Sequence, residues 1–306
     1  MILPPYSDPF LELLALAPEL FVQFSESDNL IKGVHGLGVD VDDAAQKVFV
    51  TFMLEPGYPL KSIPKSVSVT LLGEQYDIPT FTIQTPLFTF QQGNCFHQRP
   101  VRGGNCISPT GSGSLGTLGG VVISTTNERH LISSAHVLDE FGTHGIGDRI
   151  SQPKSGPDFA TIVKTAAPWT TPANSKCDAG IAEVYDPDIG DPENITDTID
   201  GIGKQGNPAS PVKDMKVKKS GATTLVKSSV IEKISQTINC EGHTFNDVFI
   251  TKESISAKGD SGALVVGPNN VIVGIVIGGN GEKTVACSIM NVIDALQLQG
   301  WTWQLP

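Results

Sequence analysis

A serine that lies between glycines carries the strongest chemical signal in this sequence. The stretch AKGDSGALVV (257–266) places Ser261 just before an apolar strand, with Gly259 and Gly262 close by. Glycine lets the backbone turn tightly and lets another molecule approach closely. A nucleophilic serine needs that room, together with backbone N–H groups that stabilise an oxyanion. The same residues also suit an ordinary turn, so the rest of the chain must supply a base.

Two further stretches supply a base and an acid. LISSAHVL (131–138) places His136 after an apolar strand among small residues, and KCDAGIAEV (176–184) places Asp178 at the start of an alternating strand. Taken alone, His136 also fits a loop histidine and Asp178 a turn or capping residue. Their joint occurrence with Ser261, each beside a strand, favours nucleophilic catalysis by a His-Asp-Ser set. Weaker candidates in polar or glycine-rich loops are His97, His144 and His243.

The elements that must hold these residues are short strands. From residue 116 onward, short apolar stretches alternate with turns, which is typical of an all-β barrel or sandwich. The apolar spacing in 288–301 predicts a terminal helix. We therefore expect a mainly β domain over 116–306 with a helix at its end.

The first part of the chain has a different pattern. Apolar spacing predicts a helix over 8–28. Strands are then expected at 33–42, 47–54, 66–73 and 78–84. Residues 1–90 are therefore predicted to form a small α+β N-terminal unit. The polar, glycine-rich stretch 91–115 is interpreted as a connector to the larger domain.

Composition excludes several classes of function. The 306 residues carry a formal net charge of −11, which argues against binding to nucleic acid or to an anionic membrane. No apolar run approaches the ~20 residues needed to span a bilayer. GSGSLG (111–116) matches the dinucleotide fingerprint, but a polar loop precedes it and a strand follows it. We expect no cofactor and no metal.

The cysteines and lysines give weaker signals. The N-terminus lacks the basic residues of a signal peptide, so a cytoplasmic location with reduced thiols is expected. The cysteines concerned, which show no metal-ligand spacing, are Cys95, Cys106, Cys177, Cys240 and Cys287. A group of lysines is predicted to lie on the solvent face of a strand. These are Lys213, Lys216, Lys218 and Lys219.

From about residue 100 to 300 the chain resembles the chymotrypsin-like (trypsin-fold) serine proteases. The resemblance rests on SAHVL, DAGIAEV, KSGATT, GDSGALVV and VGIVIGG, together with the terminal helix. It is nearest to the non-secreted members, such as the narrow-leaf plant protease type and its microbial relatives. The resemblance covers about two-thirds of the chain, and it implies a double β-barrel with the active site between the barrels.

The resemblance also implies a role for each matching residue. His136 would be the general base, Asp178 its orienting partner and Ser261 the nucleophile. The N–H groups of Gly259 and Ser261 would form the oxyanion hole. The backbone of Ile277, Gly278 and Gly279 would pair with an extended substrate chain.

The same resemblance locates the floor of the specificity pocket six residues before the serine, at Ile255. An apolar floor cannot pair with a buried cation, and Ser256 adds a hydroxyl without a charge. Cleavage after Leu, Met or Val is therefore expected rather than after Arg or Lys. A register slip would make Ser254 or Ser256 the floor instead.

Departures from the secreted relatives bear on redox state and activation. Val137 and Ala257 stand where those relatives have cysteines, and no basic residue precedes TLGGVV (117–122). Activation by cleavage to a new N-terminus is therefore doubtful, and Asp260 needs a different partner. Control by the 1–90 unit, by a regulatory partner or by a homo-oligomer is the expected substitute.

The sequence thus predicts a serine endopeptidase that acts on a protein or peptide substrate. A protease-fold binding module, which holds a peptide or partner without turnover, is the main alternative. The intact His-Asp-Ser set argues against that alternative. An esterase is a third possibility, and the lack of a G-x-S-x-G motif argues against it.

Overall fold

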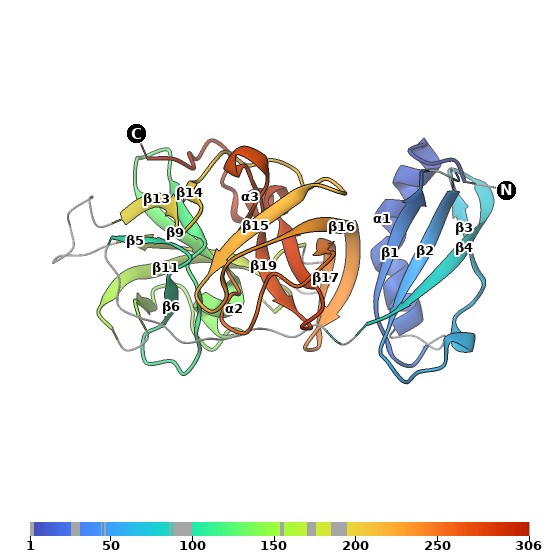
Figure 1. The fold of residues 1–306 in the computed structure, drawn as a ribbon, viewed down its shortest axis with the longest axis horizontal. Helices are drawn as coiled ribbons and strands as arrows, with labels where there is room; N and C mark the ends of the chain where they lie inside the picture. The colour runs from blue at the N-terminus through green and yellow to red at the C-terminus, as the bar shows by residue number, and fades with distance from the viewer. Residues whose placement is uncertain are drawn as a thin grey trace.

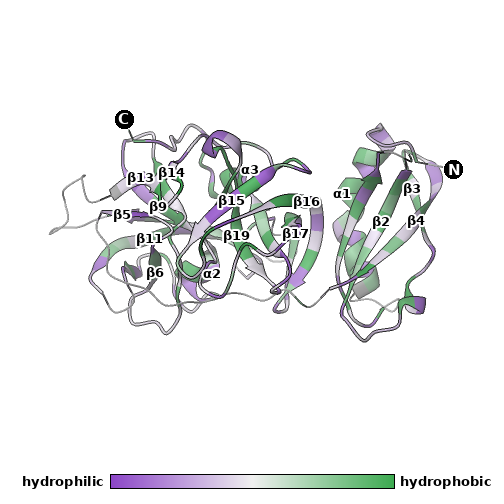
Figure 2. Ribbon diagram, in the orientation of Figure 1, coloured by the Kyte–Doolittle hydropathy of each residue, from purple (hydrophilic) through white to green (hydrophobic). Residues whose placement is uncertain are grey.

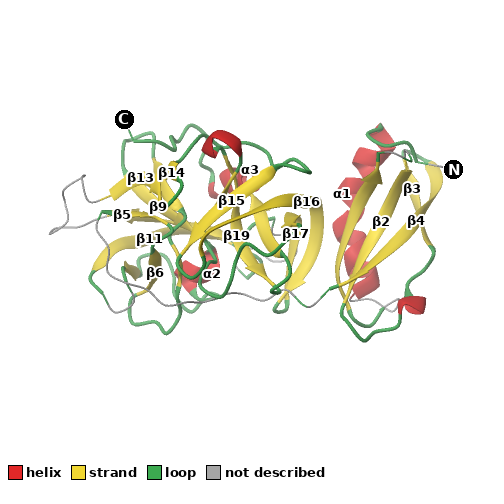
Figure 3. Ribbon diagram, viewed as in Figure 1, coloured by secondary structure: helices red, strands yellow, loops and turns green. Residues whose placement is uncertain are grey.

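A computed structural model gives the architecture of the chain (Figure 1). It describes residues 3–25, 31–43, 45, 47–85, 87, 100–153, 156–169, 176–184 and 195–305. Strands are the main regular structure in both parts of the molecule, as Figure 3 shows. None of the described helices combines the length and apolarity needed to cross a membrane.

The N-terminal unit is one helix packed on a four-stranded sheet. The elements are α1 (Asp8–Ser25), β1 (Val34–Asp42), β2 (Lys47–Leu54), β3 (Ser66–Leu71) and β4 (Glu74–Gln84), with a 3₁₀ turn at Leu60–Ser62. The strands lie in the order β1-β2-β4-β3, and β2 runs parallel to β4. Leu13 and Phe21 of α1 pack with Leu37, Val50 and other alternate strand residues in one apolar core. The predicted α+β unit is confirmed.

The first half of the larger part is a seven-stranded antiparallel sheet in the order β7-β6-β10-β11-β12-β9-β8. The strands are β6 (Cys106–Pro109), β7 (Gly116–Thr117), β8 (Gly120–Ile123), β9 (Arg129–Ser133), β10 (Arg149–Ser151), β11 (Asp158–Ala166) and β12 (Ala179–Val184). Helix α2 (Ala135–Asp139) follows β9 directly. A small sheet of β5 (Val101–Gly103), β13 (Ile195–Ile199) and β14 (Gly203–Lys204) lies beside it.

The second half is a closed six-stranded barrel, because β15 pairs with both β16 and β18. The strands are β15 (Lys216–Gly221), β16 (Leu225–Cys240), β17 (His243–Thr251), β18 (Leu264–Val266), β19 (Ile272–Gly279) and β20 (Thr284–Ser288), with a 3₁₀ turn at Pro268–Asn270. Helix α3 (Ile289–Leu296) ends the domain, with Ser288 capping its first turn through Met290 N. Ile132 and Ile181 from the first half share a core with Ile275 and Val292 from the second. The predicted double-barrel fold with its C-terminal helix is confirmed.

Strand pairing continues from the second barrel into the N-terminal unit. β16 pairs antiparallel with β1, with Gly36 opposite Ile238 and Gly38 opposite Gln236. A Cβ atom at Gly38 would lie 1.8 Å from Gln236 Oε1, so a larger residue there would force the Gln236 amide to shift. Lys233 of β16 also pairs with Asp40 of β1 at 2.6 Å. The two parts therefore share one ten-stranded sheet.

The stretch interpreted as a connector contains regular structure in its second half. β5 and β6 fall within 91–115, and β6 pairs with β7 and β10. Residues 88–99 lie outside the described residues. The boundary between a separate unit and the larger domain remains a prediction.

One expectation about the cysteines is wrong. Cys106 is disulfide-bonded, whereas Cys177, Cys240 and Cys287 are buried thiols. Burial raises the pKa of Cys287 to about 12, which keeps that thiol neutral. Cys95 lies outside the described residues. Disulfides persist mainly in oxidising compartments, and the cytoplasmic location remains a prediction.

Candidate active site

The pairing of β9 with β12 positions His136 and Asp178. Ser133 lies opposite Gly180 in this antiparallel pair, so continuing the register by two residues brings Asp178 level with the first turn of α2. His136 is the second residue of that helix. Two strand ends that meet at one edge of the sheet therefore bring together residues that are 42 positions apart.

Asp178 holds His136 at two points. Oδ1 of Asp178 accepts a hydrogen bond from the backbone N of His136 at 3.0 Å, and Oδ2 accepts one from ring Nδ1. Because the carboxylate can only accept, the proton of a neutral imidazole lies on Nδ1 and leaves Nε2 as the basic nitrogen. Asp178 is fully buried and His136 is 6% exposed. This is the arrangement that a histidine general base needs.

Ser261 lies on a tight turn just before β18. Its Oγ donates to the carbonyl of Ile277 at 2.9 Å. The next residue, Gly262, has φ of +90°, and a Cβ atom there would lie 2.2 Å from Ser133 Oγ and 2.4 Å from Thr117 O. Glycine therefore allows the serine turn to press against the end of β9, beside α2.

The carbonyl of Val276 in β19 joins the two halves of the site. It accepts hydrogen bonds from Gly262 N at 2.9 Å and from Ser134 Oγ at 2.8 Å. Gly262 follows Ser261 directly, and Ser134 precedes His136 by two residues. The serine turn and the histidine helix are therefore fixed to the same point of the second barrel.

Gly259 adopts a left-handed backbone conformation that favours glycine. Its φ is +103°, and its carbonyl accepts from Thr117 Oγ1 at 2.6 Å. Thr117 also donates its N–H to the carbonyl of Ser261 at 2.8 Å. Within the described residues the amide of Gly259 donates to no acceptor. β7 thus fixes both carbonyls of the turn.

Asp260, whose partner the sequence left open, is bound by a lysine. Lys219 Nζ lies 2.7 Å from Asp260 Oδ2, and both side chains are fully buried. Burial lowers the pKa of Lys219, and the Asp260 carboxylate opposes that shift. The backbone N–H groups of Thr223, Thr224 and Ala257 also donate to this carboxylate, as does Thr224 Oγ1 at 2.5 Å.

The prediction of a solvent-facing lysine run is therefore wrong for Lys219. From Lys216 to Lys219 the exposure alternates along β15, and Lys219 shares its inward face with Val217 (Figure 2 shows apolar and polar bands along the strands). Period-two alternation places residues 217 and 219 on the same side of a strand. The signal for a buried lysine was thus present in the sequence, since Val217 marks the inward face.

The chain is similar to solved serine protease structures. One is a glutamic acid specific serine protease that uses a histidine triad in substrate binding. The TM-score is 0.51 and the sequence identity 23%, and the match covers 64% of this chain and 98% of that chain. Another is Nocardiopsis protease (NAPase), with a TM-score of 0.51 and 14% sequence identity; the match covers 67% of this chain and 99% of that chain. A third is Thermobifida fusca protease A, with a TM-score of 0.50 and 19% sequence identity; the match covers 65% of this chain and 97% of that chain.

No protein family model and no curated protein matches the chain. The structural likeness at these identities establishes the chymotrypsin-like fold, which confirms the resemblance at that level. The finer likeness to the narrow-leaf plant protease type remains a prediction.

The residues predicted to bind substrate lie along β19 and beside β20. Gly278 pairs with Val285 and Gly279 with Thr284, and the register shifts between Val276 and Gly278. Ile255 is 1% exposed and belongs to the apolar core of the second barrel, with Phe249 and Val276 among its neighbours. Ser256 Oγ lies 2.7 Å from Thr284 Oγ1, which also accepts from Ile255 N at 2.9 Å.

A second buried acid lies next to the histidine. Asp139 ends α2 and is 2% exposed, and both of its carboxylate oxygens accept from Trp169 Nε1, at 3.1 and 3.0 Å. Burial raises the pKa of Asp139 to about 6, and the charge of Asp178 adds to that shift. Sequence reasoning missed Asp139, Trp169 and the neighbouring Phe141 because no local pattern marks them.

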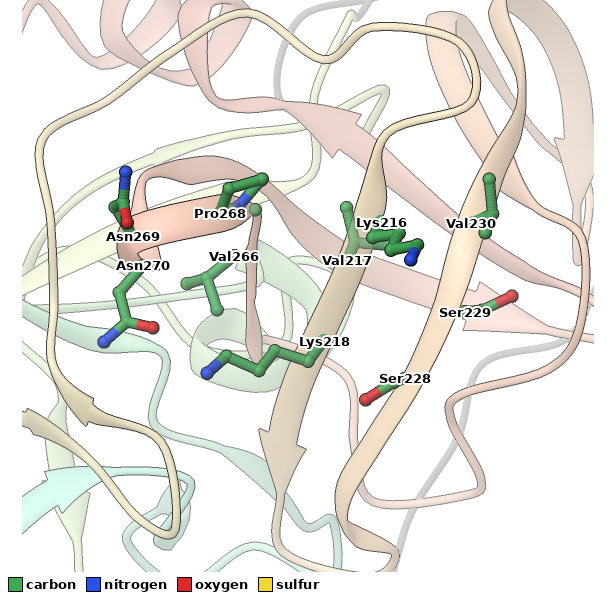
Figure 4. Close-up of a pocket in the computed structure, with 11 residues that line it drawn as sticks. Lys216, Val217, Lys218, Ser228, Ser229, Val230, Val266, Pro268, Asn269 and Asn270 are labelled. Carbon is green, nitrogen blue, oxygen red and sulfur yellow. The ribbon is translucent and has the colours of Figure 1, made fainter.

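A cavity of about 530 Å³ lies away from these residues (Figure 4). Lys216 and Lys218 of β15, Ser228 of β16 and the Pro268–Asn270 turn line it, at the opposite end of β18 from Ser261. None of the predicted site residues lines this cavity. Among the described residues, no group of three His, Cys, Asp or Glu side chains could hold a metal ion.

Proposed function

We propose that the chain is a serine endopeptidase in which His136, Asp178 and Ser261 form the catalytic triad. The observation that carries the proposal is the double contact of Asp178 with the backbone and ring of His136. The attachment of the Ser261 turn to the same β19 backbone supports it further. The chymotrypsin-like fold gives this arrangement a known chemical context.

Acylation would begin with a change in one hydrogen bond. The Ser261 hydroxyl, which donates to Ile277 O in this structure, turns toward Nε2 of His136. As Oγ bonds to the substrate carbonyl carbon, its proton passes to Nε2 and the π electrons move onto the carbonyl oxygen. The amides of Gly259 and Ser261 stabilise that oxyanion. His136 then protonates the leaving amine, and a water molecule reverses the steps to release the acyl group.

The substrate is a peptide in extended conformation. We infer that it pairs with the backbone of Ile277, Gly278 and Gly279 as an added strand. Ile255 and Ser256, which we infer to lie at the specificity pocket, supply apolar surface and a hydroxyl group there rather than a carboxylate that could neutralise a buried cation. Cleavage after Leu, Met or Val follows, rather than after Arg or Lys.

Activation would need no new N-terminus. The Lys219 ammonium supplies Asp260 with the positive charge that a liberated amine supplies in secreted zymogens. Control would then rest with the N-terminal unit or a partner, and the pairing of β1 with β16 supports the first of these.

A fluorophosphonate probe tests this function directly, since only an activated serine reacts with it. The full-length protein should label, whereas Ser261→Ala and His136→Ala should not. Ser228→Ala, which removes an exposed hydroxyl far from the triad, is the matched control and should label like the parent protein. A peptide library applied to the same proteins would report the residue before the cut.

Two results would refute the proposal. Labelling that persists in Ser261→Ala would show that another residue is the nucleophile. A folded parent protein that never labels would favour the binding module instead. Strong cleavage after Arg or Lys would overturn the substrate preference while leaving the triad intact.

A further inference from the structure

Three aromatic side chains, Phe141, Trp169 and His243, form a group beside the ring of His136. The Phe141 ring stacks on the His136 ring, with centroids 5.6 Å apart and planes 19° apart. It also stacks with His243, at 5.6 Å and 12°. Trp169 contacts both Phe141 and His243, at centroid distances of 5.0 and 5.1 Å. The general base proposed above is therefore in contact with a continuous aromatic surface.

An unusual turn places Phe141 in this position. Glu140, Phe141 and Gly142 follow α2 with φ angles of +46°, +58° and +83°. Non-glycine residues rarely adopt this left-handed conformation, and two in succession need support from their surroundings. Without the turn, the chain leaving α2 would carry Phe141 away from His136.

Polar contacts supply that support. The Glu140 carboxylate accepts hydrogen bonds from Ser112 Oγ and from Ser114 N, and it pairs with His144 at 3.1 Å. These contacts tie the turn to the segment between β6 and β7. Burial raises the pKa of Glu140, but the hydrogen bonds outweigh it and lower the pKa overall. The turn is therefore held by a group that stays ionised.

Trp169 is fixed by a separate contact. Its indole N–H donates to both carboxylate oxygens of Asp139, the last residue of α2. Asp139 also accepts from Gly142 N at 3.4 Å, so one carboxyl group contacts both Trp169 and the strained turn. Because Asp139 lies three residues after His136, the helix that carries the base also fixes the aromatic group.

We propose that Phe141 is a positioning residue that supports the His136 ring and favours its protonated form during acyl transfer. This inference rests on the proposed function. When His136 takes the proton of Ser261, its ring becomes a cation within 6 Å of the Phe141 centroid. A cation at that distance over an aromatic face is attracted by the ring quadrupole. Phe141 is 41% exposed, so solvent screens the attraction and the expected effect is small.

Several ionisable groups face this pair of rings and bear on any pH dependence. Asp178 approaches from the start of β12, Asp139 from α2 and His243 from β17. Glu140 and His144 lie in the turn after α2. The Cys240 and Cys287 thiols near Asp178 have raised pKa values and stay neutral.

The test compares Phe141→Leu, which keeps an apolar side chain, with Phe141→Tyr, which keeps the aromatic face. The rate of fluorophosphonate labelling is measured from pH 5 to pH 9 in the full-length protein. The labelling rate should rise with pH to a plateau. In Phe141→Leu the midpoint of that rise should lie about 0.4 to 0.7 pH unit lower than in the parent protein, and the plateau rate should be about two- to fivefold lower. Phe141→Tyr should keep the midpoint of the parent protein.

A second measurement does not depend on activity. The titration of the His136 ring is followed by NMR in full-length Ser261→Ala, with and without Phe141→Leu. The midpoint should fall by the same amount when Phe141 is replaced. If the proteins with and without Phe141→Leu had the same midpoint in both experiments, the inference would be overturned, even if Phe141→Leu slowed labelling. A parent protein that does not label would overturn the proposed function alone, because the NMR titration would still report the effect of Phe141.

Discussion

Each half of the candidate active site contains a buried aspartate next to a residue of the proposed triad, and the two are stabilised in different ways. Asp260 precedes Ser261 and binds the ammonium of Lys219, with both side chains fully buried. Asp139 follows His136 and accepts hydrogen bonds from neutral groups in the described part of the chain: Trp169, Gly142 and Thr165. Among the described residues, Asp260 is therefore paired with a cation, whereas Asp139 is not.

In the mechanism proposed above, the two halves have different requirements. The Ser261 turn has to keep two amides in a fixed direction, and a buried ion pair with additional donors fixes that turn strongly. The histidine has to exchange a proton during each cycle, and an aromatic group with exposed edges can accommodate its change of charge. Substitutions in the two halves should therefore differ in size and in pH dependence.

The largest effect is expected from Lys219→Met. Methionine fills much of the same volume, but it leaves Asp260 buried without its cation. Removing one partner of a buried ion pair costs about 3–5 kcal/mol of stability. The turn that carries Gly259 should also lose its fixed direction, so labelling should slow by about 10²-fold or more, as when an oxyanion-hole donor is lost. Urea unfolding and the labelling rate measure the two effects.

Lys218→Met is the matched control, because Lys218 adjoins Lys219 but points to the opposite face of β15. It should change stability by less than about 0.5 kcal/mol. The double variant Lys219→Met with Asp260→Asn removes both charges and should recover part of the lost stability. If Lys219→Met were as stable and active as Lys218→Met, the ion pair would have no part in holding the nucleophile turn.

Asp139→Asn should stabilise the folded protein, and by less than Lys219→Met destabilises it. The pKa of Asp139 is raised from 3.8 to about 6 in the folded chain, so the folded state binds more protons than the unfolded state between those values. Stability therefore falls as pH rises from about 4 to about 6, and the loss persists above pH 6. Asparagine still accepts from Trp169 without carrying a charge. The variant should gain up to about 3 kcal/mol at pH 7 and little at pH 4.

Thermal or urea unfolding at pH 4, 5, 6 and 7 measures this difference. Asp214→Asn is a suitable comparison, since that side chain is exposed and its replacement should change stability by less than about 0.5 kcal/mol at each pH. A gain that is equal at pH 4 and pH 7 would mean that the charge of Asp139 is not its source.

Local sequence patterns predicted the fold and the residues that meet at the site. Strand alternation before His136 and after Asp178 was enough, because the register of β9 with β12 brings strand ends together. Gly262 also indicated a tight turn after Ser261, and only glycine fits the observed φ and the contact with Ser133. The catalytic roles of these residues remain a proposal.

The supporting residues depend on the tertiary fold and could not be predicted in the same way. Lys219 and Asp260 are 41 positions apart in the sequence, and the pairing of β15 with β18 in the barrel brings them together. Phe141 depends on a turn that its residue types disfavour. Trp169 reaches Asp139 from the end of β11, 30 positions away. Composition and periodicity do not encode such contacts.

The smallest effect is expected where the two halves meet, at Ser134. Its hydroxyl makes no capping bond to α2 and instead donates across the barrels to Val276 O. Ser134→Ala removes that bond, but the carbonyl still accepts from Gly262 N, so the cost should be about 1 kcal/mol or less. Ser288→Ala is the matched control, because Ser288 caps α3 through Met290 N and its loss also costs about 1 kcal/mol. Both variants should unfold at slightly lower urea concentration, but only Ser134→Ala should slow labelling, by a fewfold, because only it loosens His136 relative to Ser261. Equal labelling rates in the two variants would show that the halves are held together without this bond.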